Sequence, residues 1–388
     1  MPAAVRNLFR AALVIFVITI VIGILNGTDL WEVPHNTLLA HVHSGTLGWI
    51  TLAVFGAAIW MLDPGADTRR MANFGIIALA LYILAFWSVD LTDTVTVQRP
   101  IGGTLAFIAM VWVLVWAIRS RWGKSYDVAQ LGIVLALLFL TIGAVLGVLL
   151  GLQLADVEIV APENAERLAG GHPAAMVIGF VVLAAVALIE WMVQDRAPLL
   201  SQSRWGTAQM FIIFVAGLAV VIGSLVDNEQ ILTLGVPLQI VGTLILLVRH
   251  RNRLGPSNWG PGTAPKLVRT AVIGLVAVVA FIAYLVPKLV SGEPFEDFVH
   301  VLLAMDHTNF LLVMTSLIFA MMMRGSEVSE GSARIVYLGL VVGAVGFVVG
   351  LVLEEAILKR IFTPILGLAL LYGIFTLFRA PDRAMGRA

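Results

Sequence analysis

The chain has 388 residues, of which 60% are apolar and only 12% charged, and its mean hydropathy is +0.98. This composition excludes an ordinary soluble domain and indicates an integral membrane protein with lipid, not nucleic acid, around it. The chain has no Cys, which excludes disulfides, thiolate metal sites, iron–sulfur clusters and the C-x-x-C-H attachment of haem.

Twelve apolar runs are long enough to cross a hydrocarbon core of about 30 Å. We therefore predict an all-α integral membrane fold with transmembrane helices over residues 8–28, 38–62, 70–92, 98–118, 129–154, 173–194, 206–226, 231–248, 268–290, 298–323, 334–353 and 361–378. Between the fifth and sixth helices, residues 155–171 form the longest outer segment, which we interpret as a solvated connector.

The basic residues predict the orientation in the membrane. An even number of spans puts both termini on one side, and if that side is cytoplasmic, 19 of the 24 Lys and Arg residues lie in cytoplasmic segments. This bias predicts a multi-pass protein of the cell inner (cytoplasmic) membrane with both termini in the cytoplasm. The run Arg249–Arg253 is then a cytoplasmic anchor in which His250 is solvated. The outer side keeps five basic residues: Arg99, Arg167, Lys288, Lys359 and Arg360.

The sequence also shows internal repetition. Alignment of His41 with His172, an offset of 131 residues, also aligns Gly48 with Gly179, Trp49 with Phe180, Trp60 with Trp191 and Met61 with Met192. A weaker third copy begins at VHVLLAMDH in the tenth helix. We predict three four-helix repeats, 1–124, 125–253 and 254–388, which form one membrane domain with a pseudo-threefold axis along the membrane normal.

Six of the seven histidines lie at or just inside the outer ends of the second, sixth and tenth helices: His35, His41, His43, His172, His300 and His307. Ionisable side chains within a membrane are costly and usually functional, and neutral imidazole binds haem iron, copper and zinc. His41 and His43 point about 200° apart on one helix, so they must face different neighbours. This clustering predicts a cofactor or metal site.

Three charged residues accompany these histidines. Asp306 precedes His307, where it is a candidate for orienting an imidazole, for accepting a proton, or for being protonated and hydrogen-bonded. Lys359 and Arg360 form a basic pair on the outer side, suited to the carboxylates of a haem. Glu354 and Glu355 lie in the same turn, so a local ion pair is the alternative.

Three tracts resemble the subunit I superfamily of haem–copper oxidases, which includes the large subunit of nitric oxide reductases. HVHSGTLGW (41–49) is similar to the H-x-H pattern of the family's tenth helix, DHTNFLLV (306–313) to the H-T-N pattern of the second helix in nitric oxide reductases, and LKR (358–360) to the propionate-binding basic pair. The first two motifs are thus exchanged between repeats. The resemblance implies twelve helices in three arcs and haems held toward the outer side.

The chain departs from this family at the copper or non-haem iron site. The sixth helix has one histidine, His172, and the seventh (206–224) has no His-His pair. Gln209 and Met210 lie at the cytoplasmic end of the seventh helix, where they cannot replace it. No copper site and no oxidase-like proton channel is evident, which argues against reduction of dioxygen to water.

We therefore expect a haem b protein in which His43 and His307 are the axial ligands of a low-spin haem, with Lys359 and Arg360 near its propionates. His41 and His172 would face a second haem or metal, so that one haem, or two, is bound. The expected function is electron transfer, binding of a diatomic gas, or both, and not proton pumping. The electron donor (a quinol or a cytochrome), any oxidoreductase activity with its catalytic residues, and the oligomeric state stay open.

Two alternatives remain from the sequence. One is a nitric-oxide-response haem–copper membrane protein. The other is a transporter of metal ions or small solutes, which the twelve helices, Asp306 and the histidine cluster also favour.

Overall fold

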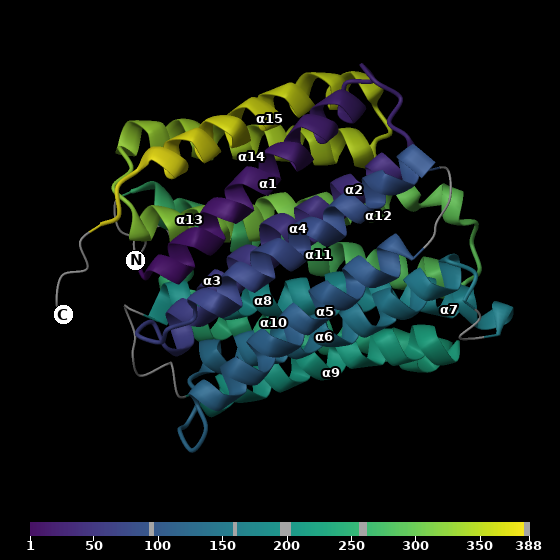
Figure 1. The fold of residues 1–388 in the computed structure, drawn as a ribbon, viewed down its shortest axis with the longest axis horizontal. Helices are drawn as coiled ribbons and strands as arrows, with labels where there is room; N and C mark the ends of the chain where they lie inside the picture. Colours follow the sequence, from purple (N-terminus) through teal and green to yellow (C-terminus); the bar gives the residue numbers. More distant parts are fainter. Residues whose placement is uncertain (93–96, 158–160, 195–202, 256–261, 384–388) are drawn as a thin grey trace.

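The computed structural model describes residues 1–92, 97–157, 161–194, 203–255 and 262–383. In these residues twelve helical stretches are long and apolar enough to cross a membrane, and each overlaps one of the predicted spans. The prediction of an all-helical, multi-pass fold is therefore confirmed. The helices run roughly parallel to one another in a single bundle (Figure 1).

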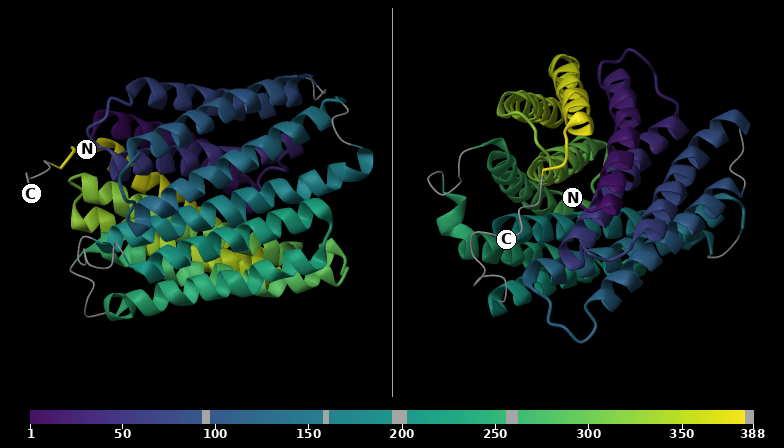
Figure 2. Two further views of the ribbon diagram at one scale, coloured as in Figure 1. Left: turned by 90° about the horizontal axis from the view of Figure 1, so that it is seen from below. Right: turned by 60° about the vertical axis from the view of Figure 1, so that its left-hand side comes forward.

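Nine spans are unbroken α-helices, and they form the outer part of the bundle. They are α1 (Ala3–Gly27), α4 (Arg69–Thr92), α5 (Gln98–Ser120), α6 (Val128–Leu154), α9 (Arg204–Val226), α10 (Glu229–Leu254), α11 (Thr263–Val290), α14 (Glu330–Val352) and α15 (Ala356–Arg379). α9 packs along α10, and α14 along α15. Figure 1 and the right-hand view of Figure 2 show α14 and α15 together at one side of the bundle.

The second, sixth and tenth spans are each divided by a π-helical segment of eight residues. They consist of α2 (His35–His43), η1 (Ser44–Thr51) and α3 (Leu52–Leu62); α7 (Pro162–Pro173), η2 (Ala174–Val181) and α8 (Val182–Gln194); and α12 (Val299–His307), η6 (Thr308–Thr315) and α13 (Ser316–Gly325). A π-helix pairs each N–H with the carbonyl five residues back, and such segments often occur at functional sites.

These three interrupted spans occupy the centre of the bundle. Their most apolar 18-residue windows are 89%, 78% and 67% buried, whereas no other span exceeds 50%. Hydroxyls support the π turns, because Thr51 Oγ1 donates to the carbonyl of Thr46 at 3.0 Å and Thr315 Oγ1 to that of Phe310 at 2.8 Å. The indole Nε1 of Trp49 also donates to Thr315 Oγ1, at 2.9 Å, and joins η1 to η6.

Both termini lie at the same end of the bundle, which we call the termini side (Figure 1). An ion pair of 2.9 Å between Arg6 and Asp382 links the two ends of the chain there. The four histidines selected as candidate ligands lie near the opposite end, which we call the far side. The isolated 3-10 helix η5 (Phe295–Asp297) precedes the tenth span on that side.

The interpretation of residues 155–171 as a connector is wrong for much of that segment. α7 begins at Pro162, so the sixth span starts eleven residues earlier than the predicted Pro173. Proline is well suited to the first turn of a helix because its missing N–H needs no partner there. Pro173 instead lies inside the helix, just before η2, where the hydrogen-bond pattern changes. Residues 158–160 lie outside the described part.

Candidate functional site

Four imidazoles near the far side share one hydrogen-bonding state. Nδ1 of His41 lies 2.9 Å from the carbonyl oxygen of Thr19, and Nδ1 of His43 lies 2.8 Å from that of Leu39. Nδ1 of His172 lies 2.9 Å from the carbonyl oxygen of Gly143, and Nδ1 of His307 lies 2.7 Å from that of Leu303. Because a carbonyl only accepts, each Nδ1 carries the proton, and Nε2 of the neutral ring keeps its lone pair. Hydrogen-bonded Nδ1 with a bare Nε2 is the state in which histidine binds a metal.

None of these four Nε2 atoms has a hydrogen-bond partner among the described residues. The side chains are only partly exposed, although the helices that carry them lie in the most buried part of the bundle.

His41 faces α1. Its Nδ1 donates to the carbonyl of Thr19, and its ring lies against Gly23, one turn further along α1. A Cβ built at Gly23 would lie 3.1 Å from Cε1 of His41, so only glycine leaves the ring at this depth without displacement. Gly27, another turn along, packs against Thr363 of α15.

His307 faces α14 and completes the same surroundings. Its ring lies edge-on to Phe347, with centroids 5.0 Å apart. α14 packs along α15, and α15 in turn packs on α1, the helix against which His41 lies. The elements α1, α2, α12, α14 and α15 thus surround one pair of imidazoles, which we call site 1.

His43 points to the other side of α2, where its ring stacks on Phe86 of α4 with centroids 4.1 Å apart and lies edge-on to Tyr82 at 5.7 Å. Beyond this ring, Gly103 of α5 packs between Tyr82 and Val148 of α6.

His172 faces α6 as His41 faces α1. A Cβ at Gly147 would lie 2.8 Å from its Cε1, and its Nδ1 donates to the carbonyl of Gly143, one turn before Gly147. Gly151, one turn after, lies near Pro100 of α5. The elements α2, α4, α5, α6 and α7 therefore surround a second pair of imidazoles, His43 and His172, which we call site 2.

The sequence interpretation joined His43 to His307 and His41 to His172. The elements that the rings contact favour another pairing, because His41 and His307 lie against α1 and α14, and His43 and His172 lie against α4 and α6. The prediction that His41 and His43 face different compartments agrees with their contacts, on α1 and α4 respectively.

Each site has basic residues on the far side. At site 1, Lys359 and Arg360 lie in the first turns of α15. Arg360 pairs with Asp29 at 2.9 Å with both side chains about half exposed, and no described residue forms an ion pair with the Lys359 ammonium. At site 2, Arg99 in the first turn of α5 is only 6% exposed, donates to Asn36 and lies over the ring of Phe86 at 4.7 Å. Sequence reasoning did not select Arg99 as a site residue.

The other far-side candidates have different surroundings. His35 is exposed, and His300 lies at ion-pair distance, 2.7 Å, from Glu354. Asp306 makes no hydrogen bond to His307 in the described structure, and its buried Oδ1 has no partner. The carbonyl of Leu303, not Asp306, orients the His307 ring.

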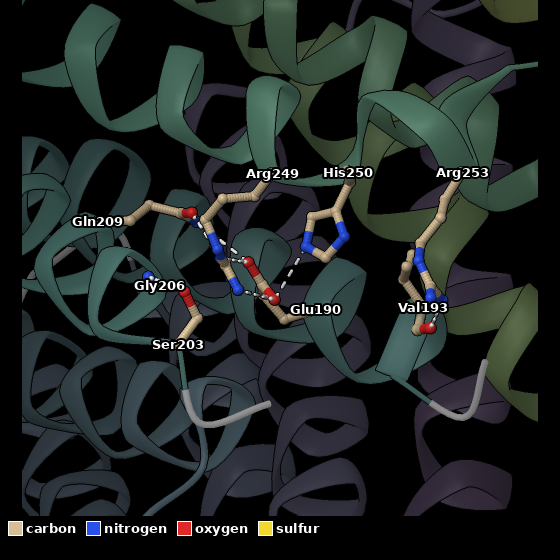
Figure 3. A network of polar contacts seen from close by, with 8 residues as sticks. All are labelled: Glu190, Val193, Ser203, Gly206, Gln209, Arg249, His250 and Arg253. Atoms are coloured by element: carbon tan, nitrogen blue, oxygen red, sulfur yellow. Dashed lines mark hydrogen bonds and ion pairs between the residues drawn. The ribbon is translucent and has the colours of Figure 1, made fainter. Parts of the chain in front are cut away.

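A second polar cluster lies at the termini side of α8, α9 and α10 (Figure 3). The carboxylate of Glu190, fully buried, accepts two hydrogen bonds from Arg249, one from Gln209 at 3.4 Å and one from Nε2 of His250 at 3.0 Å. The expectation that His250 is solvated is therefore wrong, because its side chain is 1% exposed. The run Arg249–Arg253 anchors α10 inward on Glu190 and on the carbonyl of Val193.

Among the described residues, no three His, Asp or Glu side chains are grouped to hold a metal ion. No protein-family model and no curated protein matches this sequence. The paired histidines are therefore the feature of the fold with the clearest chemistry.

Proposed function

We propose that the chain is a membrane protein that binds haem b between His41 and His307 and transfers electrons. The observation that carries this proposal is that both imidazoles face the same group of helices, each with Nδ1 hydrogen-bonded to a carbonyl and Nε2 unpartnered among the described residues. Two neutral imidazoles and an apolar slot are what a low-spin haem requires, and a bound haem supplies one reversible electron.

The residues of site 1 fit this group in three ways. The absence of a Cβ at Gly23 lets the His41 ring lie directly against α1. Phe347 holds the His307 ring from the side, and the Leu303 carbonyl fixes its tautomer. Lys359, in the first turn of α15, offers a cation on the far side for a propionate. With both axial positions occupied by histidine, this centre has no place for a gas ligand, so electron transfer is the function it supports.

The contacts also support three repeats with a common plan. π segments divide the second, sixth and tenth spans, and η1 and η6 follow directly after His43 and His307. In α1 and α6 a backbone carbonyl accepts a hydrogen bond from an imidazole, and the residue one turn later is a glycine under the same imidazole: Thr19 and Gly23 in α1, Gly143 and Gly147 in α6. We infer that repeats 1–124, 125–253 and 254–388 form a ring with a pseudo-threefold axis.

For the orientation, we propose that the termini side faces the cytoplasm in the cell inner membrane. The support is the basic bias of the segments on that side, which is the distribution the positive-inside rule predicts. Site 1 and site 2 then lie near the outer surface.

A reduced-minus-oxidised optical spectrum of the purified protein tests the proposal. We expect the sharp bands of a six-coordinate haem b, and their loss from site 1 in His307→Ala but not in the matched control His35→Ala, which changes an exposed histidine. A protein purified without haem that takes up none would overturn the proposal and favour a transporter. Haem bands that stay as in the wild type in both His41→Ala and His307→Ala would refute the ligand assignment.

A further inference from the structure

A groove of about 320 Å³ lies at the termini side, between the beginning of α1 and the ends of α13 and α15. Its floor is apolar and includes the buried side chains of Phe9 and Leu377. Its rim is charged and carries Arg6, Arg10 and Asp382. An apolar floor beneath a cationic rim is the combination that an amphiphile with an anionic head group requires.

The rim has one cation more than it has carboxylates. Arg6 forms an ion pair of 2.9 Å with Asp382, and its buried Nε has no hydrogen-bond partner among the described residues. No described carboxylate pairs with Arg10, whose guanidinium lies over the ring of Phe378, 5.5 Å from the centroid. Two guanidiniums and one carboxylate leave a net charge of +1 on the rim, which matches the single charge of a phosphodiester.

Apolar, exposed side chains continue from this rim toward the middle of the membrane. Val14 follows Arg10 by one turn on the same face of α1 and is exposed, as are Phe375 and Phe378 on α15. The two helices pack on one another. An acyl chain that leaves the groove therefore stays in contact with the apolar surface that α1 and α15 share.

We propose that this groove binds one anionic phospholipid, with its phosphate at Arg6 and Arg10 and an acyl chain along α1 and α15. Guanidinium donors match the geometry of phosphate oxygens, and basic pockets between transmembrane helices bind anionic head groups on the cytoplasmic side. The amine of a zwitterionic head group would find no unpaired carboxylate on the rim, because Asp382 pairs with Arg6. None of these residues belongs to either histidine site, so lipid binding and haem binding can be tested separately.

Native mass spectrometry of the delipidated full-length protein tests the proposal, with phosphatidylglycerol and phosphatidylethanolamine of the same acyl chains as probes. We expect one tightly bound phosphatidylglycerol per chain. Arg10→Gln should weaken its binding roughly fivefold, the usual effect of one basic residue on an anionic lipid, whereas Arg10→Lys should retain most of the affinity. The matched control is Arg70→Gln, which removes an exposed cation of α4 outside the groove.

Three results would each overturn the site. They are equal affinity for the two lipids, equal weakening in Arg10→Gln and Arg70→Gln, and displacement of the lipid by an equal concentration of inorganic phosphate, which would make free phosphate the occupant. Because Arg10 is exposed, the unfolding midpoint of the lipid-free protein should be the same in Arg10→Gln and wild type. Added phosphatidylglycerol should raise the midpoint of the wild type more than that of Arg10→Gln, and an equal rise in both would also overturn the site.

Discussion

The imidazole of His172 lies directly over Gly147, so close that a Cβ at residue 147 would be 2.8 Å from Cε1 of the ring. The hydrogen bond from Nδ1 to the Gly143 carbonyl holds the ring there. Position, tilt and tautomer of this candidate ligand are therefore set by one turn of α6.

Gly147→Val should displace the His172 ring and destabilise the protein by about 1–3 kcal/mol, the usual cost of overpacking a well-packed position. Thermal unfolding in detergent measures this as a lower midpoint. Gly331→Ala is the control, because a Cβ there meets no atom within 4 Å. Equal unfolding midpoints of Gly147→Val and wild type would contradict the placement of the ring.

The buried cluster around Glu190 should contribute strongly to stability. Arg249→Met leaves a fully buried carboxylate with only His250 and Gln209 as partners, and breaking a buried pair costs about 3–5 kcal/mol. Thermal unfolding in detergent should show a lower midpoint. Arg69→Met, which breaks an exposed pair with Asp67, should cost about 0.2–1 kcal/mol. The double variant Glu190→Leu with Arg249→Leu should be less damaging than Arg249→Met alone.

Thr315→Val should destabilise the contact between η1 and η6 by about 1–3 kcal/mol, because it leaves the buried indole N–H of Trp49 without its acceptor. Thr51→Val is a matched control: its hydroxyl also donates to a carbonyl five residues back, but no indole depends on it in the described structure. Unfolding midpoints compared in one detergent give the difference. Equal losses in the two variants would show that the indole hydrogen bond contributes nothing measurable.

The orientation predicts the behaviour of reporter fusions. A fluorescent protein fused after Ala388 should fold and fluoresce, because that terminus is expected in the cytoplasm. An alkaline phosphatase fused after Asp227, between α9 and α10, should be active, because the enzyme requires export. The opposite pattern would invert the orientation and place both histidine sites near the cytoplasm.

The number and positions of the spans followed from hydropathy, because length and apolar composition decide which segments can cross a bilayer. The depth of the histidines followed as well. Their partners did not, because the angle between His41 and His43 says that they diverge but not which neighbour each one meets. That depends on how α1 and α4 pack on either side of α2, through contacts such as Thr19–His41 and Phe86–His43.

Other features were missed for identifiable reasons. In the sequence, Arg99 resembles an ordinary flanking charge at the start of a span. Its position on the side with few basic residues was a signal that it has a specific role. His250 stands in a run of arginines that is typical of a solvated anchor, and the sign of burial was Glu190, an acidic residue in an otherwise apolar helix. The π segments have no recognisable sequence pattern, since a single extra residue per turn leaves composition unchanged.

His41 and His43 leave the same helix two residues apart, so the spacing between the two sites is fixed by covalent geometry and not by the packing of separate domains. Thermal motion of the loops would therefore not change the position of the His41 ring relative to the His43 ring. If both sites carry haem, electron exchange between them needs no conformational gate, and its rate should vary smoothly with driving force and hardly at all with solvent viscosity.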